Sequence, residues 1–174
     1  MAEDLRGEEA ALVAVQHALA DRPGVLTGAR ALSHFGEHSI GWVAVSALGA
    51  LLQPSRRRAW LAAGAGAFLA HAAAVVIKRV VKRERPQHPA VAVSVGTPSR
   101  LSFPSAHATS TTAASILLAR TTGLPLPVVL VPPMALSRLV LGVHYPSDVL
   151  TGVAVGAIIA KTVGAVADRV GGGS

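Results

Sequence analysis

Long apolar runs dominate the chain, and short polar or proline- and glycine-containing segments separate them. Residues 59–77 and 101–119 contain no Asp, Glu, Lys or Arg, and residues 39–54 and 121–137 are shorter runs of the same kind. Residues 149–167 are apolar apart from one lysine. Because a helix needs about 20 apolar residues to cross the hydrocarbon core of a bilayer, these runs predict membrane helices.

Prolines, glycines and charges mark where the helices should begin and end. They predict helices over residues 10–20, 25–38, 39–52, 59–85, 104–119 and 124–141, and a last helix that begins at Pro146. The first is too short to span and partly amphipathic, so we expect it to lie in the interface. The predicted fold is all-α: an integral membrane bundle of about five to six membrane helices plus this interfacial helix. We expect one domain over residues 1–170 and a flexible Gly-rich tail over residues 171–174.

Composition supports a membrane protein. Hydrophobic residues make up 51% of the chain and charged residues 14%, against about 25% charged in a soluble domain. The absence of cysteine excludes disulfides and thiolate metal sites. A net charge of +7 fits nucleic acid or an anionic membrane surface, but 3% aromatic residues are too few for base stacking. We therefore expect a multi-pass protein of the cell membrane with membrane lipids, not nucleic acid, as partners.

The chemistry is concentrated in three polar clusters, at residues 78–86, 104–107 and 137–148. Successive membrane helices alternate in direction, so counting crossings places all three clusters at the same face of the membrane. The basic residues are nearly balanced between the two faces, so the charge distribution does not choose which side of the membrane holds the clusters.

The first cluster supplies cations. Lys78 and Arg85 are seven residues apart, which on a continuous helix puts them on one face, with Lys82 roughly between them. Arginine can bind a phosphate through two N–H groups, and lysine adds a point charge. The alternative is a basic edge that sets topology or touches anionic lipid.

The other two clusters supply histidines. Pro104 suits the first turn of a helix, where free N–H groups bind anions, Ser105 can donate another bond, and His107 follows. His144 lies four residues before Asp148, within reach of a carboxylate that would fix its tautomer. A capped helix start and a structural His–Asp bond are the alternatives. Together with Arg138, the clusters suit binding a phosphate and transferring it through a histidine.

The pattern Lys78-x6-Arg85-Pro86, Pro104-Ser105-Ala106-His107, Ser137-Arg138-x5-His144-x3-Asp148 resembles the type 2 phosphatidic acid phosphatase superfamily. The resemblance implies a metal-independent phosphatase that needs no cofactor and forms a phosphohistidine. It implies His144 as nucleophile, Asp148 as its orienting group and His107 as general acid. The phosphate-binding residues that it implies are Lys78, Arg85, Ser105, Ala106 and Arg138. Ala106 stands where the family usually has glycine, which alters the approach of backbone to phosphate.

The chain also resembles a narrower group, the small actinobacterial and mycobacterial decaprenylphosphoryl-5-phosphoribose phosphatases. The likeness rests on the short length, on residues 33–39 and 105–107, and on Leu124-Pro125-Leu126-Pro127. It implies a polyprenyl phosphoribose substrate in cell-wall arabinan precursor synthesis. Phosphatidylglycerol phosphate and polyprenyl pyrophosphate remain alternatives within the family. A vanadium haloperoxidase and a phosphate-gripping lipid carrier or scaffold are rivals outside it. Self-association through Gly152-x-x-x-Gly156 stays open.

Residues 34–38 read His-Phe-Gly-Glu-His, the spacing of inverted zinc peptidases. Gly36 weakens the helix that such a site needs, and no third ligand is identifiable. We therefore expect His34, Glu37 and His38 to contact substrate at the mouth of the phosphate site, together with Lys82. No metal site is expected.

Overall fold

The computed structural model describes residues 7–171, and within that range its regular elements are helices, with one isolated β-bridge between Glu84 and Leu101 in the long loop after α4. Residues 1–6 of the predicted domain and 172–174 of the predicted tail lie outside the described residues, and Gly171 is the last residue of α7. The elements are α1 (Gly7–Leu19), α2 (Val25–Gly36), η1 (Glu37–Ser39), α3 (Ile40–Leu52), η2 (Pro54–Arg56), α4 (Arg57–Val81), α5 (Ala106–Thr122), α6 (Leu126–Val140) and α7 (Pro146–Gly171).

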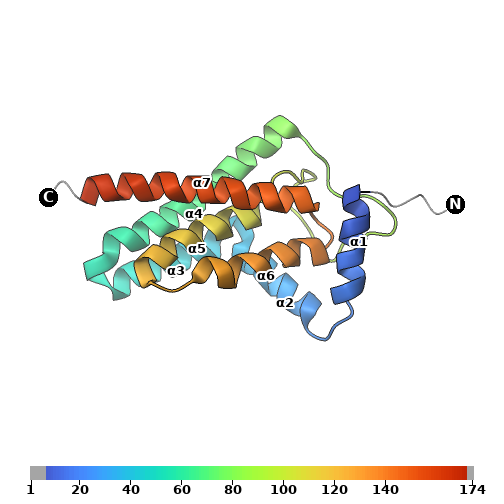
Figure 1. Ribbon diagram of the computed structural model, residues 1–174, viewed down its shortest axis with the longest axis horizontal. Coiled ribbons are helices and arrows are strands. Elements are labelled where there is room, and N and C mark those ends of the chain that lie inside the picture. Colours follow the sequence, from blue (N-terminus) through green and yellow to red (C-terminus); the bar gives the residue numbers. More distant parts are fainter. Residues whose placement is uncertain (1–6, 172–174) are drawn as a thin grey trace.

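Helix α5 is the centre of the bundle and packs against α4, α6 and α7, while α1 lies crosswise at one end (Figure 1). Twelve of the seventeen α5 residues are buried, several of them serines and threonines. All of these hydroxyls except that of Thr112 form hydrogen bonds within the described part of the bundle. For example, Thr109 Oγ1 donates to the Ser105 carbonyl at 2.7 Å, and Trp42 Nε1 donates to Thr111 Oγ1 at 3.1 Å. Satisfied in this way, a polar helix can occupy the core.

Small residues bring the helices together. The stripe of Gly152, Gly156, Ala160 and Gly164 on α7 is buried against α5 and its neighbours. A Cβ at Gly156 would stand 2.4 Å from the Thr109 carbonyl oxygen, so only glycine allows this approach. The stripe therefore packs within the chain.

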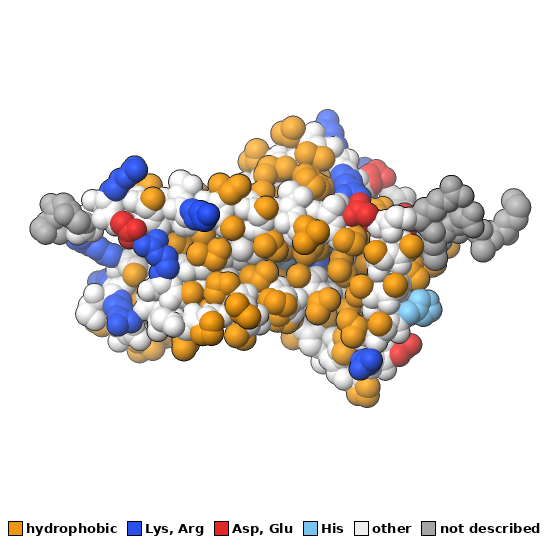
Figure 2. Space-filling view, viewed as in Figure 1, with side chains coloured by type: hydrophobic (Ala, Val, Ile, Leu, Met, Phe, Trp, Pro, Cys, Tyr) orange, Lys and Arg blue, Asp and Glu red, His pale blue; other side chains and the backbone are white. Residues whose placement is uncertain are grey.

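The prediction of an all-α membrane bundle is confirmed. Three helical segments in the described chain are long and apolar enough to cross a membrane by length and composition: Val25–Leu52, Pro54–Val81 and Pro146–Gly171. Helix α6 is a shorter apolar helix. In the face seen in Figure 2, hydrophobic side chains cover the middle of the molecule and charged ones gather towards the two ends. The number of crossings, five to six, stays a prediction.

The helix predicted over residues 59–85 ends earlier, and this changes the site. Helix α4 stops at Val81, and Lys82 adopts a left-handed conformation with φ 54°. The chain then runs alongside residues 100–102: Arg85 N donates to the Arg100 carbonyl at 3.1 Å, and Ser102 N donates to the Arg83 carbonyl at 2.8 Å. These tertiary hydrogen bonds outweigh the helical tendency of the segment before Pro86.

Candidate active site

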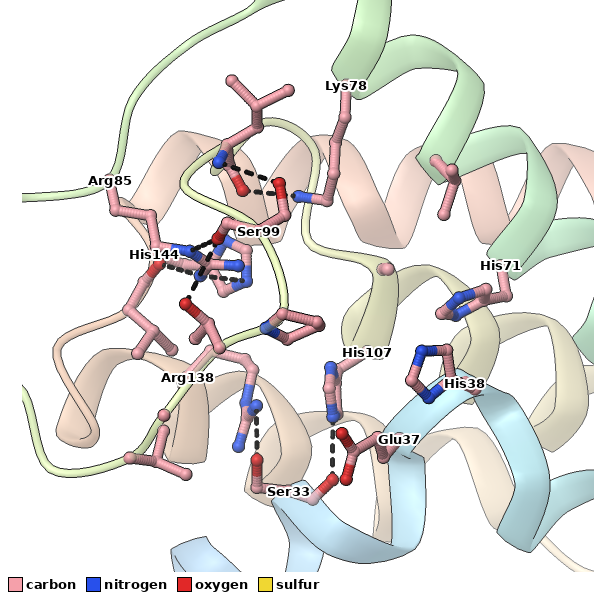
Figure 3. A pocket seen from close by; sticks show the side chains of 18 of the residues that line it. Ser33, Glu37, His38, His71, Lys78, Arg85, Ser99, His107, Arg138 and His144 are labelled. Carbon is pink, nitrogen blue, oxygen red and sulfur yellow. Dashed lines mark hydrogen bonds between the residues drawn. The ribbon is translucent and has the colours of Figure 1, made fainter.

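A cavity of about 590 Å³ opens among α2, α4, α5, the loop after α4 and the connection between α6 and α7. Nine of the predicted site residues line it, from four separate parts of the chain: His34, Glu37, His38, Lys78, Arg85, Ala106, His107, Arg138 and His144. His71, which was not among the predicted residues, lines it as well (Figure 3). Asp148 lies behind His144, away from the cavity. Lys82 and Ser105 do not line it.

His144 has the orientation that a nucleophile needs. Arg85 Nη1 lies 3.4 Å from His144 Nε2, and because a guanidinium only donates, Nε2 must present its lone pair. The ring proton is then on Nδ1, which faces Asp148 Oδ2 at 3.6 Å; this is an ion-pair distance, longer than a hydrogen bond, and Nδ1 has no hydrogen-bond partner among the described residues. Burial, and then the nearby Arg85, Lys78 and Arg138, hold the pKa of His144 well below its ordinary value. The imidazole is therefore neutral at pH 7.

Ser33 on α2 holds two of the predicted site residues. His107 Nε2 lies 2.9 Å from the Ser33 carbonyl, and because a carbonyl only accepts, Nε2 carries a proton there. Arg138 Nη1 donates to Ser33 Oγ at 3.1 Å. Neighbouring Gly36 leaves room for the His107 ring, since a Cβ at Gly36 would stand 2.7 Å from His107 Cδ2. The residue type of Ser33 does not predict this role, because a backbone carbonyl is present at every position.

Arg138 carries the clearest mark of an anion site. It is 2% exposed, and its Nε donates to Ser137 Oγ at 3.1 Å. Its Nη2 has no hydrogen-bond partner within the part of the chain that the structure describes, although Arg138 lines the cavity. A buried, charged N–H group without an acceptor is costly unless a ligand supplies one. An anionic oxygen in the cavity would do so.

Backbone groups add to this site at the start of α5. Ser105 caps the helix by accepting from Ala108 N at 3.4 Å. Its hydroxyl could still donate, but Ser105 does not line the cavity, so the structure does not place it as the predicted phosphate donor. The N–H groups of Ala106 and His107, in the first turn, have no acceptor among the described residues. Both residues line the cavity, so the helix N-terminus can contribute to anion binding there.

Lys78 differs from its predicted role. Its Nζ contacts three backbone carbonyls, those of Leu101 at 3.3 Å, Ser102 at 2.7 Å and Pro104 at 2.7 Å. An ammonium group has three donors, so none remains for a phosphate oxygen. Lys78 therefore anchors the loop segment 101–104 that precedes α5, and it contributes positive charge to the cavity without contacting the phosphate.

Arg85 reaches the cavity by a different route from the one predicted. The prediction that Lys78 and Arg85 share one helix face is wrong, because α4 ends at Val81. Lys82 is exposed and does not line the cavity. Arg85 Nε donates to the Ser99 carbonyl at 2.9 Å and Nη1 to the Val143 carbonyl at 2.5 Å. Burial lowers the pKa of Arg85 to about 10, so it remains charged at neutral pH.

Glu37 and His38 lie on the opposite side of His107 from His144, where Figure 3 also shows His71, and His34 lines the same cavity. His34 Nδ1 is 3.9 Å from Glu37 Oε2, and the rings of His38 and His71 are 5.6 Å apart. The shared helical face assumed for a zinc pair is wrong, because α2 ends at Gly36 and His38 has a φ of 49°. Across residues 7–171 no group of three His, Cys, Asp or Glu is placed to hold a metal.

A comparison with protein families matches residues 59–170 to the PAP2 superfamily. Among curated proteins, one from Mycolicibacterium smegmatis is 80% identical over 152 residues, which are 87% of this chain and 84% of that protein. Another, from Mycobacterium tuberculosis, is 71% identical over 168 residues, 97% of this chain and 93% of the other. Both are named decaprenylphosphoryl-5-phosphoribose phosphatase.

Two solved structures share the fold. A transmembrane PAP2 type phosphatidylglycerolphosphate phosphatase from Bacillus subtilis superposes with a TM-score of 0.72 at 20% identity, over 92% of this chain and 86% of the other. LpxE from Aquifex aeolicus gives a TM-score of 0.67 at 19% identity, over 92% of this chain and 96% of the other. At this level of identity, the likeness concerns the fold alone.

Proposed function

The chain belongs to the PAP2 superfamily, and from this premise we propose that it is a cell-membrane phosphatase that hydrolyses decaprenylphosphoryl-5-phosphoribose to decaprenylphosphoryl ribose and inorganic phosphate. The names of the relatives at 80% and 71% identity support the substrate. The observation that carries the chemistry is the orientation of His144 Nε2, which shares one cavity with Arg138 Nη2, a group that has no hydrogen-bond partner among residues 7–171.

The first step transfers the phosphoryl group to the enzyme. His144 Nε2 attacks phosphorus, the bond from phosphorus to the ribose 5-oxygen breaks, and His107 protonates that oxygen as it leaves. Asp148 stabilises the imidazolium character that develops on His144. Arg138, Arg85 and the first N–H groups of α5 stabilise the charge on the non-transferred oxygens.

The second step regenerates the enzyme. Water attacks the phosphohistidine, His107 accepts the proton of that water, and inorganic phosphate leaves. Because His107 Nε2–H is bonded to the Ser33 carbonyl, we assign the exchanging proton to Nδ1. Burial and the nearby Arg138 disfavour the imidazolium form that acts as the acid, and the Ser33 carbonyl favours it, so the negative charge of the bound phosphate must supply the remaining stabilisation.

The geometry also suggests where the sugar lies. In phosphoryl transfer the attacking and leaving atoms are roughly in line, so the ribose should extend past His107, away from His144. That side of the cavity holds Glu37, His38 and His71 (Figure 3). A carboxylate and imidazoles are good partners for sugar hydroxyls, so we assign ribose recognition to this side, with His34 at its rim.

Phosphate release from the purified protein tests the proposal, with four lipids: decaprenylphosphoryl-5-phosphoribose, decaprenyl pyrophosphate, phosphatidylglycerol phosphate and phosphatidic acid. We expect the highest kcat/KM for the first, and Glu37→Gln should lower that value more than the value for phosphatidic acid. A higher kcat/KM for phosphatidylglycerol phosphate would contradict the proposed substrate. Binding without release of phosphate from any lipid would favour a carrier.

A further inference from the structure

We propose that the N-terminal helix α1 is a working part of the active site: Glu8 holds Arg83, and Arg83 holds the Asp148 carboxylate that orients His144. The inference rests on the proposed phosphatase chemistry but not on which lipid is the substrate. Arg83 and Glu8 would be positioning residues, since neither lines the cavity. The region matched to the family begins at residue 59, so Glu8 lies outside it.

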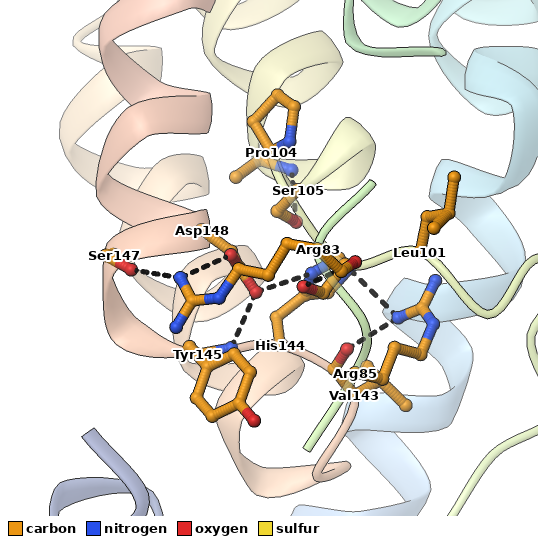
Figure 4. A network of polar contacts seen from close by, with 12 residues as sticks. Arg83, Arg85, Leu101, Pro104, Ser105, Val143, His144, Tyr145, Ser147 and Asp148 are labelled. Carbon is orange, nitrogen blue, oxygen red and sulfur yellow. Dashed lines mark hydrogen bonds and ion pairs between the residues drawn. The ribbon is translucent and has the colours of Figure 1, made fainter. Parts of the chain in front are cut away.

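Arg83 is the direct partner of the buried carboxylate. Its Nη1 lies 3.0 Å from Asp148 Oδ1 and donates to Ser147 Oγ at 2.6 Å (Figure 4). The other carboxylate oxygen, Oδ2, accepts from Tyr145 N at 2.8 Å and faces His144. The Arg83 guanidinium also lies over the Tyr145 ring, 4.0 Å from its centroid. Asp148 is therefore fixed from both sides, with one oxygen left directed at the histidine.

Glu8 fixes the arginine and the helix that carries Asp148 at the same time. Its Oε2 accepts from Arg83 Nη2 at 2.5 Å, and its Oε1 accepts from Ser147 N at 2.7 Å. Ser147 is in the first turn of α7, where backbone N–H groups favour a negative charge. Burial acts to raise the pKa of Glu8, but the hydrogen bonds from Ser147 and Arg83 lower it overall, so the carboxylate is charged at neutral pH.

Helix α1 contacts the rest of the protein along its whole length and not only through Glu8. Near its other end, Gln16 Nε2 donates to the Ala92 carbonyl at 2.7 Å, and Ala92 N donates back to Gln16 Oε1 at 3.1 Å. The same amide nitrogen donates to the Val140 carbonyl at 3.0 Å. Leu12, between Glu8 and Gln16, is fully buried. The helix thus joins the loop after α4 to both ends of the α6–α7 connection.

The loss of Arg83 should change the reactivity of His144 and not only the stability of the protein. Without this cation, a carboxylate with no exposed surface would keep the Tyr145 N–H, the Ser102 hydroxyl and the more distant charge of Lys78, and its affinity for protons would rise. The charged and titratable groups around this carboxylate are Arg83, Arg85, Lys78, His144 and Tyr145, with Glu8 beyond Arg83.

The first test is Arg83→Gln, measured as phosphate release from decaprenylphosphoryl-5-phosphoribose and from dioleoyl phosphatidic acid. We expect kcat to fall about 10- to 100-fold, the range seen when outer partners of functional histidines are removed, with little change in KM. The pH at which activity is lost on acidification should rise relative to the wild type, because Asp148 and His144 both bind protons more readily. Arg83→Lys should recover part of kcat. Arg100→Gln, an exposed arginine of the same loop, is the matched control and should behave as the wild type.

The second test is a double-mutant cycle with Glu8→Ala. If Glu8 acts through Arg83, Glu8→Ala lowers kcat, and the double variant is no slower than Arg83→Gln alone. Asp21→Asn, an exposed acid just past α1, is the control for loss of a negative charge. Glu8→Gln keeps an acceptor for Ser147 N and serves if Glu8→Ala does not fold.

Two results would overturn the inference: an Arg83→Gln variant with wild-type kcat and pH profile, or fully additive losses in the cycle. Neither result can be confused with failure of the proposed function. If the proposed function were wrong, the wild-type protein itself would release no phosphate from either lipid.

Discussion

A single methyl group at Gly36 should disable the enzyme without unfolding it. An added Cβ would stand 2.7 Å from His107 Cδ2 and 3.2 Å from the end of the Met134 side chain. The methionine can move, but the imidazole is held by its 2.9 Å hydrogen bond to Ser33. The Gly36 backbone itself tolerates alanine, since φ is −82°. The ring must therefore shift by several tenths of an ångström, and the bond to Ser33 must lengthen.

The expected magnitudes follow from this overlap. Overpacking costs about 1–3 kcal/mol, and alanine in place of helical glycine returns about 1 kcal/mol, so Tm should change little. Catalysis is more sensitive, because a displacement on the order of 1 Å can cost about 100-fold. For a smaller shift, we expect Gly36→Ala to lower kcat about 10- to 100-fold. Gly28→Ala on the same helix is the control, since nothing lies within 4 Å of its added Cβ.

The assay is kcat and KM for phosphate release, with Tm measured on the same preparations. In a His107→Ala background, Gly36→Ala should cause no further loss, because the ring that it displaces is gone. The reasoning is refuted if Gly36→Ala keeps kcat within about twofold of the wild type, or if it loses as much activity in the His107→Ala background as in the wild type.

Three further outcomes follow from the site. Ser33→Ala keeps the carbonyl that His107 uses but removes the acceptor of Arg138 Nη1, so KM should rise about tenfold, and an unchanged KM would count against it. The lowered pKa of His144 means that it gains its proton below pH 6.5, so ¹⁵N NMR of the imidazole should give a midpoint under that value, and a midpoint above it would contradict the assignment. Activity should survive excess chelator; inhibition by chelator that zinc reverses would instead revive a metal site at His34.

Much of the fold could be predicted from the sequence because the membrane simplifies the problem. Long apolar runs and prolines locate helices well, and the start of α7 at Pro146 and the arrangement of His144 and Asp148 were as expected. The end of α4 was not, because hydrogen bonds with residues 100–102, remote in sequence, decide it. Local pattern alone extends that helix to Arg85, just before Pro86.

The site was predictable in its residue types but not in its supporting contacts. The spacing of the motif residues brought His107, Arg138 and His144 together correctly. Ser33 could not be found, because its contact with His107 is made by the backbone carbonyl, which any residue type would supply. Arg83 is one of five basic residues between residues 78 and 85, and only its contact with Asp148 distinguishes it.

The account depends above all on His144 as the residue that carries the phosphoryl group. The direct measurement is a single turnover with substrate labelled in the ribose 5-phosphate, quenched in alkali, followed by mass spectrometry of the labelled peptide. We expect acid-labile label on His144 in the wild type, more of it in His107→Ala if hydrolysis of the intermediate slows, and none in His144→Ala. Label on another residue, or phosphate release from His144→Ala at more than a few per cent of the wild-type rate, would contradict the central claim.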